Sequence, residues 1–291
     1  MRTKLFLSLL TAVLLARAQE VSPWKLSLES NLTLTLNTYS TNWTGAEKGS
    51  FTWVGKMTGI AEKQIIKQIN NLNTLKLAFG QTKTENKDAV TGDRTWTSPA
   101  KSTDLIDFET VFKFTLGGWV DPYLSGKAVS QFFDPAPDFD YYFNPVDFTE
   151  SFGVMRDLIK KDNMSSFVRF GGAFKQNVNR RRPADTLTLS DGGLELVAEY
   201  KADKIKETIS FLSRLSIYEA LFRFNAPEGY TDFRHPDVKW ENVLTVSLFK
   251  YLMLSYSADL LYDIETETSP QFRQSFGAGV TFLINNSKAA Q

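Results

Sequence analysis

Residues 252–264 read LMLSYSADLLYDI. Apolar, aromatic or alanine side chains occupy every even position from Leu252 to Ile264, and the odd positions between them include Ser255 and Asp259. A period of two is typical of a β-strand, whose side chains point alternately to opposite faces. The apolar face continues over roughly ten residues, the length that a tilted strand needs to cross a membrane. The stretch therefore predicts a membrane-spanning strand.

The same alternation recurs along the chain and predicts about twelve antiparallel strands. It is clear in the first strand, where leucines from Leu26 to Leu36 share one face. The alternation is weak in residues 50–65, 119–132 and 147–160, so it defines the ends of these three strands only approximately. The expected strands cover residues 24–38, 50–65, 71–84, 102–116, 119–132, 147–160, 165–178, 193–203, 205–222, 238–249, 252–264 and 270–284.

The connections between these strands alternate in length. An outer-membrane barrel has tight turns on the periplasmic side and longer loops outside, and an even strand number places both termini in the periplasm. The pattern thus predicts a single closed transmembrane antiparallel β-barrel, all-β in class, with ten or fourteen strands as alternatives. Short connections are expected at 67–70, 117–118, 161–164, 203–204 and 250–251, and long ones at 37–49, 84–101, 133–145, 179–192 and 225–236, with 265–269 shorter.

The N-terminus predicts an exported protein. Arg2 and Lys4 precede an apolar core at 5–15, and Ala16-Arg17-Ala18 is a small-x-small cleavage signal. This is the pattern of a secretory signal peptide, because the apolar core is too short to span a bilayer. We expect a signal peptide at 1–18 and the barrel domain at 19–291.

Composition excludes several classes of protein. The chain has 33 basic and 33 acidic residues, and the part after Ala18 has 30 and 33, so a general nucleic-acid binder is not expected. There is no cysteine, which excludes disulfides and a lipoprotein anchor. With one histidine as well, ordinary zinc sites are excluded and no cofactor is expected.

The two faces of the strands favour a membrane barrel over a soluble periplasmic or secreted β protein, which remains the alternative. The polar faces mix charges of both signs, as a wet lumen would, while the apolar faces stay uniform from end to end. Aromatic rings near strand ends suit the headgroup level of a bilayer. The polar-face charges include Glu29, Lys239, Glu241, Asp259 and Asp263, and the candidate interfacial rings are Trp24, Trp119 and Tyr251.

The last strand carries alternating aromatic residues and glycines from Phe272 to Phe282, similar to the C-terminal signal that barrel-assembly machinery recognises. Together with other stretches, it makes the chain resemble a family of outer-membrane β-barrel proteins of Bacteroidetes-type bacteria that carries a domain-of-unknown-function label. The resemblance implies fold and location and no particular activity. It rests on Asn42-Trp43 followed by Gly45 and Ser50, on Lys101-Ser102-Thr103-Asp104, on Gln131-Phe132 and on the glycine-bearing last strand, with Ala46 where the family usually has a second glycine.

Two of the long loops contain candidate ligand contacts. The loop at 133–145 is rich in aromatic rings, which predicts either a ligand platform or plug or a loop that packs on its neighbours above the membrane. The loop after residue 178 contains a run of arginines, which predicts either a contact with anions such as lipopolysaccharide phosphates or a solvated loop tip. The candidates are Phe133, Tyr141, Tyr142, Arg180, Arg181 and Arg182.

Catalytic and metal-binding signals are weaker. His235 beside Asp237 could serve as a general base in an outer-membrane hydrolase, but no Gly-x-Ser-x-Gly nucleophile motif is present. Asp134, Asp138 and Asp140 could bind Ca²⁺ weakly, yet they lack the spacing of a calcium loop. We therefore expect no catalytic residue and no metal site.

The sequence thus predicts an outer-membrane barrel without enzymatic activity. The first hypothesis is a passive or weakly selective channel for small solutes, because twelve strands enclose a wider lumen than eight. The second is a surface-binding or envelope-scaffold barrel, and the third a hydrolase that uses His235. Expected partners are outer-membrane lipid, the barrel-assembly machinery and a small-molecule solute.

Overall fold

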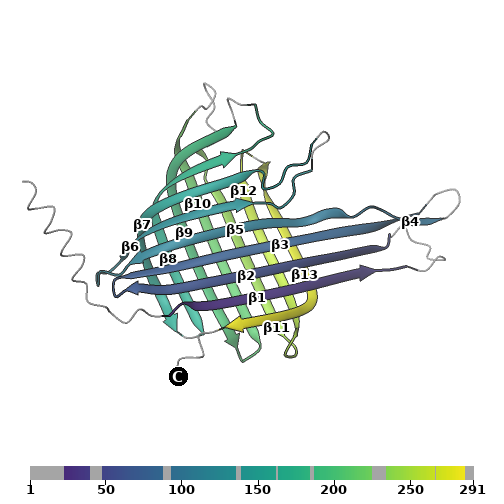
Figure 1. Cartoon of the computed structure of the whole chain (residues 1–291), viewed down its shortest axis with the longest axis horizontal. Helices are drawn as coiled ribbons and strands as arrows, with labels where there is room; N and C mark the ends of the chain where they lie inside the picture. Colours follow the sequence, from purple (N-terminus) through teal and green to yellow (C-terminus); the bar gives the residue numbers. More distant parts are fainter. Residues whose placement is uncertain are drawn as a thin grey trace, which may run out of the picture.

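A computed structural model of the chain shows a closed β-barrel of twelve antiparallel strands (Figure 1). The structure describes residues 23–39, 48–87, 93–135, 139–161, 163–183, 187–224, 234–265 and 267–285. In that part of the chain no helix is long and apolar enough to cross a membrane. The barrel strands are β1 (Lys25–Asn37), β2 (Ser50–Ile66), β3 (Ile69–Lys87), β5 (Ala100–Phe114), β6 (Asp121–Ser130), β7 (Val146–Lys161), β8 (Met164–Val178), β9 (Thr188–Ile205), β10 (Ile209–Phe224), β11 (Asp237–Ser247), β12 (Leu252–Asp263) and β13 (Glu267–Asn285).

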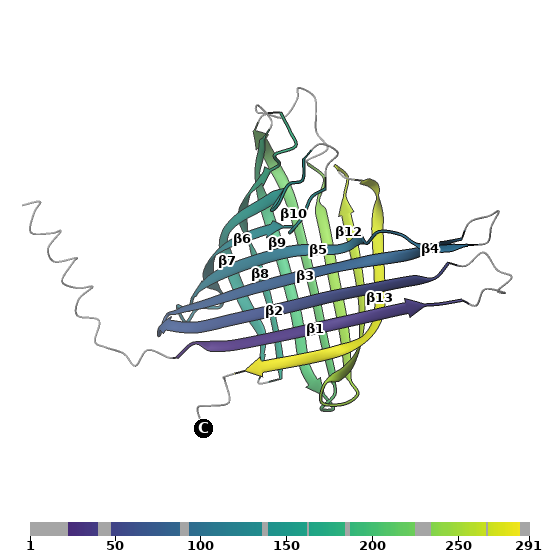
Figure 2. The same ribbon diagram turned by 45° about the vertical axis from the view of Figure 1, so that its right-hand side comes forward.

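Each barrel strand pairs with its neighbours in sequence, and β1 closes the barrel against β13. A thirteenth strand, β4 (Arg94–Trp96), pairs only with the end of β3 and extends beyond the wall. The front strands β1 to β3 cross the rear strands at a steep angle, and β13 bends from the rear wall to the front (Figure 2). The predicted closed barrel and its strand number are confirmed.

The apolar face of the strands points outward. Four of the five even-numbered leucines of β1 are exposed on the outer wall, among them Leu34 at 54% and Leu36 at 64%. On β13 the outward positions are Phe272, Phe276 and Phe282, which are also exposed. Polar residues occupy many of the alternate positions that face the lumen, and buried Tyr123, Met155 and Val197 are among the exceptions. A water-soluble barrel would bury its apolar face inside, so this arrangement is that of a barrel solvated by lipid.

The three predicted interfacial rings all lie at the barrel end that carries the short turns. Each is exposed and has a cation near its face: Lys63 Nζ lies 5.4 Å from the centroid of Trp24, the Arg156 guanidinium 4.5 Å from Trp119, and Lys250 Nζ 4.9 Å from Tyr251. Cation–π contacts of this kind are worth about 0.5–1 kcal/mol at exposed sites. Rings and long basic chains together suit a headgroup layer at this end.

Several predicted boundaries were wrong. The turn expected at 203–204 lies at 206–208, because β9 continues to Ile205 and the positive φ angles of Lys206 and Glu207 make the reversal there. The long loop expected at 179–192 ends earlier, since β9 begins at Thr188. The loop expected at 84–101 contains β4 and the extended end of β3.

Candidate functional site

A charge cluster lies in the middle of the lumen. Glu109 on β5 accepts hydrogen bonds from two arginines, through Oε1 from Arg169 Nη2 on β8 at 2.7 Å and through Oε2 from Arg214 Nη2 on β10 at 2.8 Å. Arg214 also donates to Glu199 on β9 at 3.0 Å, and Arg169 lies 3.5 Å from Glu195. Glu109, Arg169 and Arg214 are buried, with Arg169 only 3% exposed, whereas Glu195 and Glu199 are partly buried. Water is thus excluded from the contacts between Glu109 and the two arginines.

The bond from Glu109 to Arg214 crosses the lumen. β5 and β10 are five strands apart in one direction and seven in the other. Twelve strands about 4.8 Å apart and tilted by about 40° would form a circular barrel about 24 Å across. Extended Glu and Arg side chains together reach only about 12 Å from their backbones. The barrel is therefore flattened where β5 approaches β10, and this bridge divides the lumen into two lobes.

The smaller lobe, bounded by β6 to β9, is packed. Ser125 and Ser151 share a 2.6 Å hydrogen bond, and Ser151 is 2% exposed. Tyr123 lies under the Arg169 guanidinium, 5.5 Å from ring centroid to carbon, and Val197 completes the filling. Small hydroxyls, one ring and apolar chains leave no continuous wet path here.

Ion pairs continue the closure above and below the central cluster. Toward the long loops, the Tyr218 hydroxyl donates to Asp191 at 2.5 Å, and Lys175 on β8 reaches Asp237 on β11 at 3.0 Å. Toward the short turns, Lys113 pairs with Asp157 at 2.5 Å and with Asp121 at 3.3 Å. Charges in the smaller lobe thus neutralise one another, as burial requires. Arg223 joins the upper group through Asp191 at 3.0 Å and Glu265 at 2.7 Å.

The larger lobe, bounded by β11 to β13 and β1 to β3, is open. Arg273 on β13 bonds Asp259 on β12 at 2.7 Å, yet its side chain is 77% exposed. Lys56 on β2 is also exposed. Ser257 and Ser275 share a 2.7 Å hydrogen bond and face the same lobe. Exposed polar side chains on inward positions mean that this lobe is accessible to water.

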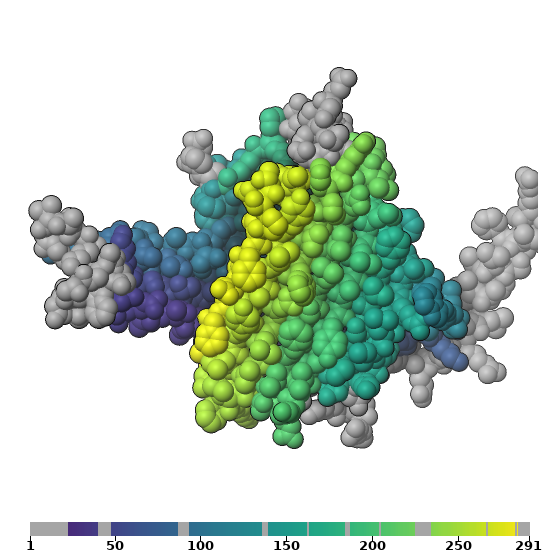
Figure 3. Space-filling view, turned by 180° about the vertical axis from the view of Figure 1, so that it is seen from behind, coloured from purple at the N-terminus to yellow at the C-terminus, as the bar shows by residue number. Residues whose placement is uncertain are grey.

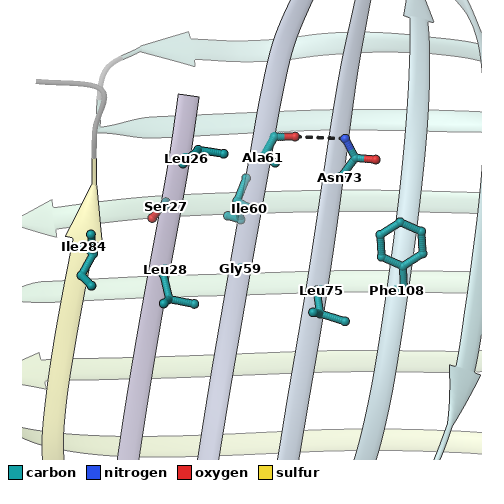
Figure 4. Close-up of a pocket in the computed structure, with 10 residues that line it drawn as sticks. All are labelled: Leu26, Ser27, Leu28, Gly59, Ile60, Ala61, Asn73, Leu75, Phe108 and Ile284. Atoms are coloured by element: carbon teal, nitrogen blue, oxygen red, sulfur yellow. Dashed lines mark hydrogen bonds between the residues drawn. The ribbon is translucent and has the colours of Figure 1, made fainter. Parts of the chain in front are cut away.

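The outer wall carries a hollow of about 480 Å³ near the short-turn end (Figure 4). Gly59 and Ala61 on β2 leave space between Leu26, Leu75 and Ile284, so the lining is almost wholly apolar. Asn73 closes one side and donates to the Ala61 carbonyl at 3.3 Å. Its amide nitrogen also donates to Asn71 Oδ1 at 2.6 Å, on a wall that otherwise faces lipid.

The structure brings all six predicted loop candidates together at the long-loop end. The Phe133 and Tyr142 rings lie 5.8 Å apart, and the Arg180 guanidinium lies 5.5 Å from the Tyr141 centroid. Arg180 also donates to the Tyr142 carbonyl, and Arg181 pairs with Asp134 at 2.5 Å. The loops therefore pack on each other, which was the alternative to a free ligand platform. Arg182, next in the run, shares this segment.

Two buried polar residues fix this loop pair to the barrel rim. Asn144, 1% exposed, donates to Asp134 at 2.8 Å and accepts from the Arg180 backbone N–H at 2.8 Å. Asp104 accepts from the backbone N–H groups of Phe132 at 2.6 Å and Phe133 at 3.0 Å, while Lys101 donates to Gln131 at 2.6 Å. The stretches 101–104 and 131–132, which carried the family resemblance, thus form one rim contact.

The remaining sequence candidates are His235 and the acidic residues proposed to bind a metal ion. His235 is exposed on the segment before β11, and its proposed base role stays a hypothesis. Among the described residues no group of three His, Cys, Asp or Glu could hold a metal ion, and Asp134 bonds Arg181 and Asn144 instead. Asp138, Asn42-Trp43, Gly45 and the predicted signal peptide lie outside the described residues.

Sequence reasoning missed the central cluster. Glu109, Arg169 and Arg214 each sit at an inward position between outward apolar or small residues, so their facing was readable from the alternation. Which charge meets which across the lumen was not readable, because that depends on the flattening of the barrel. A search for charges at inward positions of every strand would have given the list without the pairs.

The similarity of this chain to known proteins lies among solved structures. No protein-family model and no curated protein matches the sequence. Among solved structures, an outer-membrane channel from Pseudomonas putida is 10% identical, with 92% of this chain and 97% of that chain covered and a TM-score of 0.41. The translocator domain of the autotransporter NalP from Neisseria meningitidis is 10% identical, covering 97% and 95%, with a TM-score of 0.36. A mutant porin of Rh. blastica is also 10% identical, covering 91% and 100%, with a TM-score of 0.24. Scores of this size carry no argument about function, and the barrel rests on the strand pairing itself.

Proposed function

We propose that this chain is an exported outer-membrane barrel that acts as a passive, weakly selective channel for small solutes. The observation that carries the proposal is the unequal filling of the lumen. The smaller lobe is packed and ion-paired, whereas Arg273, Lys56 and the Ser257–Ser275 pair face open space in the larger lobe. Solutes pass through the larger lobe only. Both signs of charge border it, which fits weak selectivity.

The outer-membrane location and the signal peptide belong to this proposal. An outward apolar wall requires lipid, and a closed barrel leaves no unpaired edge over most of its circumference. The short-turn end carries the girdle of rings and cations, the start of β1 and the end of β13. In this proposal that end faces the periplasm.

Planar-bilayer recording tests the channel. Purified, folded protein gives discrete conductance steps that scale with salt concentration, while the same sample boiled in detergent before addition gives none. Silent bilayers with protein that migrates as a folded, heat-modifiable band would contradict the proposal.

A surface-binding role is the second candidate, and one observation favours it. Phe139, Tyr142 and Phe143 stay exposed on the loop pair at the long-loop end although its backbone is fixed by Asn144 and Asp104. Rigid exposed rings suit recognition of a sugar or apolar surface. Replacing Tyr142 by Ala would abolish adhesion of whole cells to a glycan array if this role holds, and conductance would not change.

A further inference from the structure

The seam between the first and last strands is paired over only part of its length. Pairing runs from Ser27 opposite Asn285 to Thr33 opposite Gly279. Beyond that point β1 continues to Asn37 beside β2, while β13 runs back to Glu267 beside β12. Residues 34–37 and 267–278 therefore border a gap, called here the seam wedge, with no strand pairing across it among the described residues. The two strands diverge in Figure 3, where β13 is yellow and β1 purple.

Two glycines build the closed end of the seam wedge. A Cβ on Gly279 would lie 2.2 Å from the Leu32 carbonyl oxygen, and one on Gly277 would lie 2.3 Å from Thr33 Cγ2. Only residues without a side chain allow β13 to cross β1 this closely. The two glycines of β13 thus determine where β13 and β1 separate.

The borders of the seam wedge are apolar outside and polar inside. Leu34 and Leu36 on one border and Phe272 and Phe276 on the other are exposed on the outer wall. On β13, residues 267–276 are exposed at inward and outward positions alike, unlike a strand paired on both sides. Unpaired backbone groups at membrane depth are tolerated where they are buried in protein or line a water-filled cavity, and these exposed residues are not buried in protein. The seam wedge therefore joins the wet larger lobe to the lipid.

Two cations, Arg273 and Lys56, face the lumen behind the seam wedge. Arg273 lies on its border with its side chain 77% exposed, and its ion-pair partner is Asp259. Lys56 of β2 faces the same region and interacts electrostatically with both. Arg273, Lys56 and Asp259 together carry one net positive charge at a place that also opens onto hydrocarbon.

We propose that the seam wedge admits a single-chain anionic amphiphile, with its head group at Arg273 and Lys56 and its hydrocarbon chain between Leu36 and Phe276. The proposal rests on the channel function, because it adds a lateral branch to the larger lobe and names a substrate class for it. A carboxylate or a phosphate head satisfies the same two cations, since both accept charge-assisted hydrogen bonds.

Disulfide trapping tests whether the seam wedge is open, and the absence of native cysteine makes it clean. Extending the seam register would place Leu36 opposite Phe276, so the double variant Leu36→Cys/Phe276→Cys bridges only if the strands zip together. The matched control is Leu28→Cys/Ile284→Cys, an outward pair that lies directly opposite in the closed part. We expect the control to oxidise and the wedge pair to stay reduced in membranes. Rapid bridging of the wedge pair, within one chain or between two copies, would overturn the proposal.

Photolabelling tests the ligand. A diazirine-bearing twelve-carbon fatty acid, added to the full chain in phosphatidylcholine nanodiscs, should label peptides from 34–37 and 267–278. Dodecanoate and dodecyl phosphate should compete, the stronger competitor identifying the preferred head group, and dodecyltrimethylammonium should not. Arg273→Gln should reduce labelling about tenfold, the equivalent of one lost charged hydrogen bond. Lys160→Gln, on β7 and with its side chain 81% exposed, should leave it unchanged.

Labelling spread evenly around the outward wall, or unaffected by Arg273→Gln, would overturn the proposal. The channel is judged separately by conductance. Conducting protein without wedge labelling defeats this inference alone, and wedge labelling in protein that does not conduct defeats the channel alone.

Discussion

Replacing Glu109 by Gln tests the cross-lumen bridge. The substitution keeps the shape and one acceptor oxygen but removes the charge that two arginines share. Arg214 retains Glu199 at 3.0 Å, whereas Arg169 is left with Glu195 at 3.5 Å. Breaking a buried ion pair from one side costs about 3–5 kcal/mol, and a charged hydrogen bond contributes about 1.5–3 kcal/mol. Because Gln can still accept one bond, we expect Glu109→Gln to lower the free energy of unfolding by about 3 kcal/mol.

Urea unfolding in phosphatidylcholine vesicles, followed by the heat-modifiable band, measures this loss. Lys160→Gln is the control, since its side chain is 81% exposed and 4.0 Å from Asp157, and it should change the free energy by less than about 0.5 kcal/mol. The same Glu109→Gln protein should show larger conductance steps, because the bridge no longer holds β5 near β10. A free energy of unfolding within about 0.5 kcal/mol of the parent, with unchanged conductance, would refute the divided lumen.

Three further substitutions probe other parts of the structure. Asp104→Asn removes an acceptor from the Phe132 and Phe133 N–H groups, so the loop at 131–145 should lose about 2 kcal/mol of local stability and be cut faster by protease; an unchanged digestion rate would count against the rim contact. Gly279→Val places a side chain against the Leu32 carbonyl and should sharply reduce the folded, heat-modifiable fraction, whereas Gly118→Ala, with its nearest contact at 3.5 Å, should not. Arg156→Ala removes the cation over Trp119 and should lower the free energy of unfolding in urea by about 0.5–1 kcal/mol. If neither Arg156→Ala nor Trp119→Ala lowers this free energy, the girdle is contradicted.

Most of the wall could be predicted from sequence because lipid and water act on alternate residues. β1 and β12 have lipid on one side and the wet larger lobe on the other, so their alternation is clear and their bounds were confirmed within a few residues. β6 and β7 face the packed lobe, where Tyr123 and Met155 are buried at inward positions. An apolar residue inside blurs the period of two, which explains why residues 119–132 and 147–160 alternated weakly.

The interior could not be predicted, because its contacts join strands far apart in sequence. The bond between Glu109 and Arg214 spans 105 residues and depends on the cross-section of the barrel. The loop candidates show the same limit: aromatic and arginine runs singled out Phe133, Tyr141 and Arg180, whose ligand role stays a prediction, and the packing of these loops on each other is visible only in the structure. The local sequence pattern indicates which side chains are unusual for their position, and the tertiary fold determines which residues they contact.

The divided lumen is the central claim, and blocking the current through single cysteines tests it most directly. Ser275→Cys places a thiol in the open larger lobe, and Ser151→Cys places the same thiol in the packed smaller lobe, where the serine is 2% exposed. A charged, membrane-impermeant thiol reagent added during bilayer recording should reduce the current of the Ser275→Cys channel and leave that of Ser151→Cys unchanged. Block of Ser151→Cys, or full current through modified Ser275→Cys, would contradict the account.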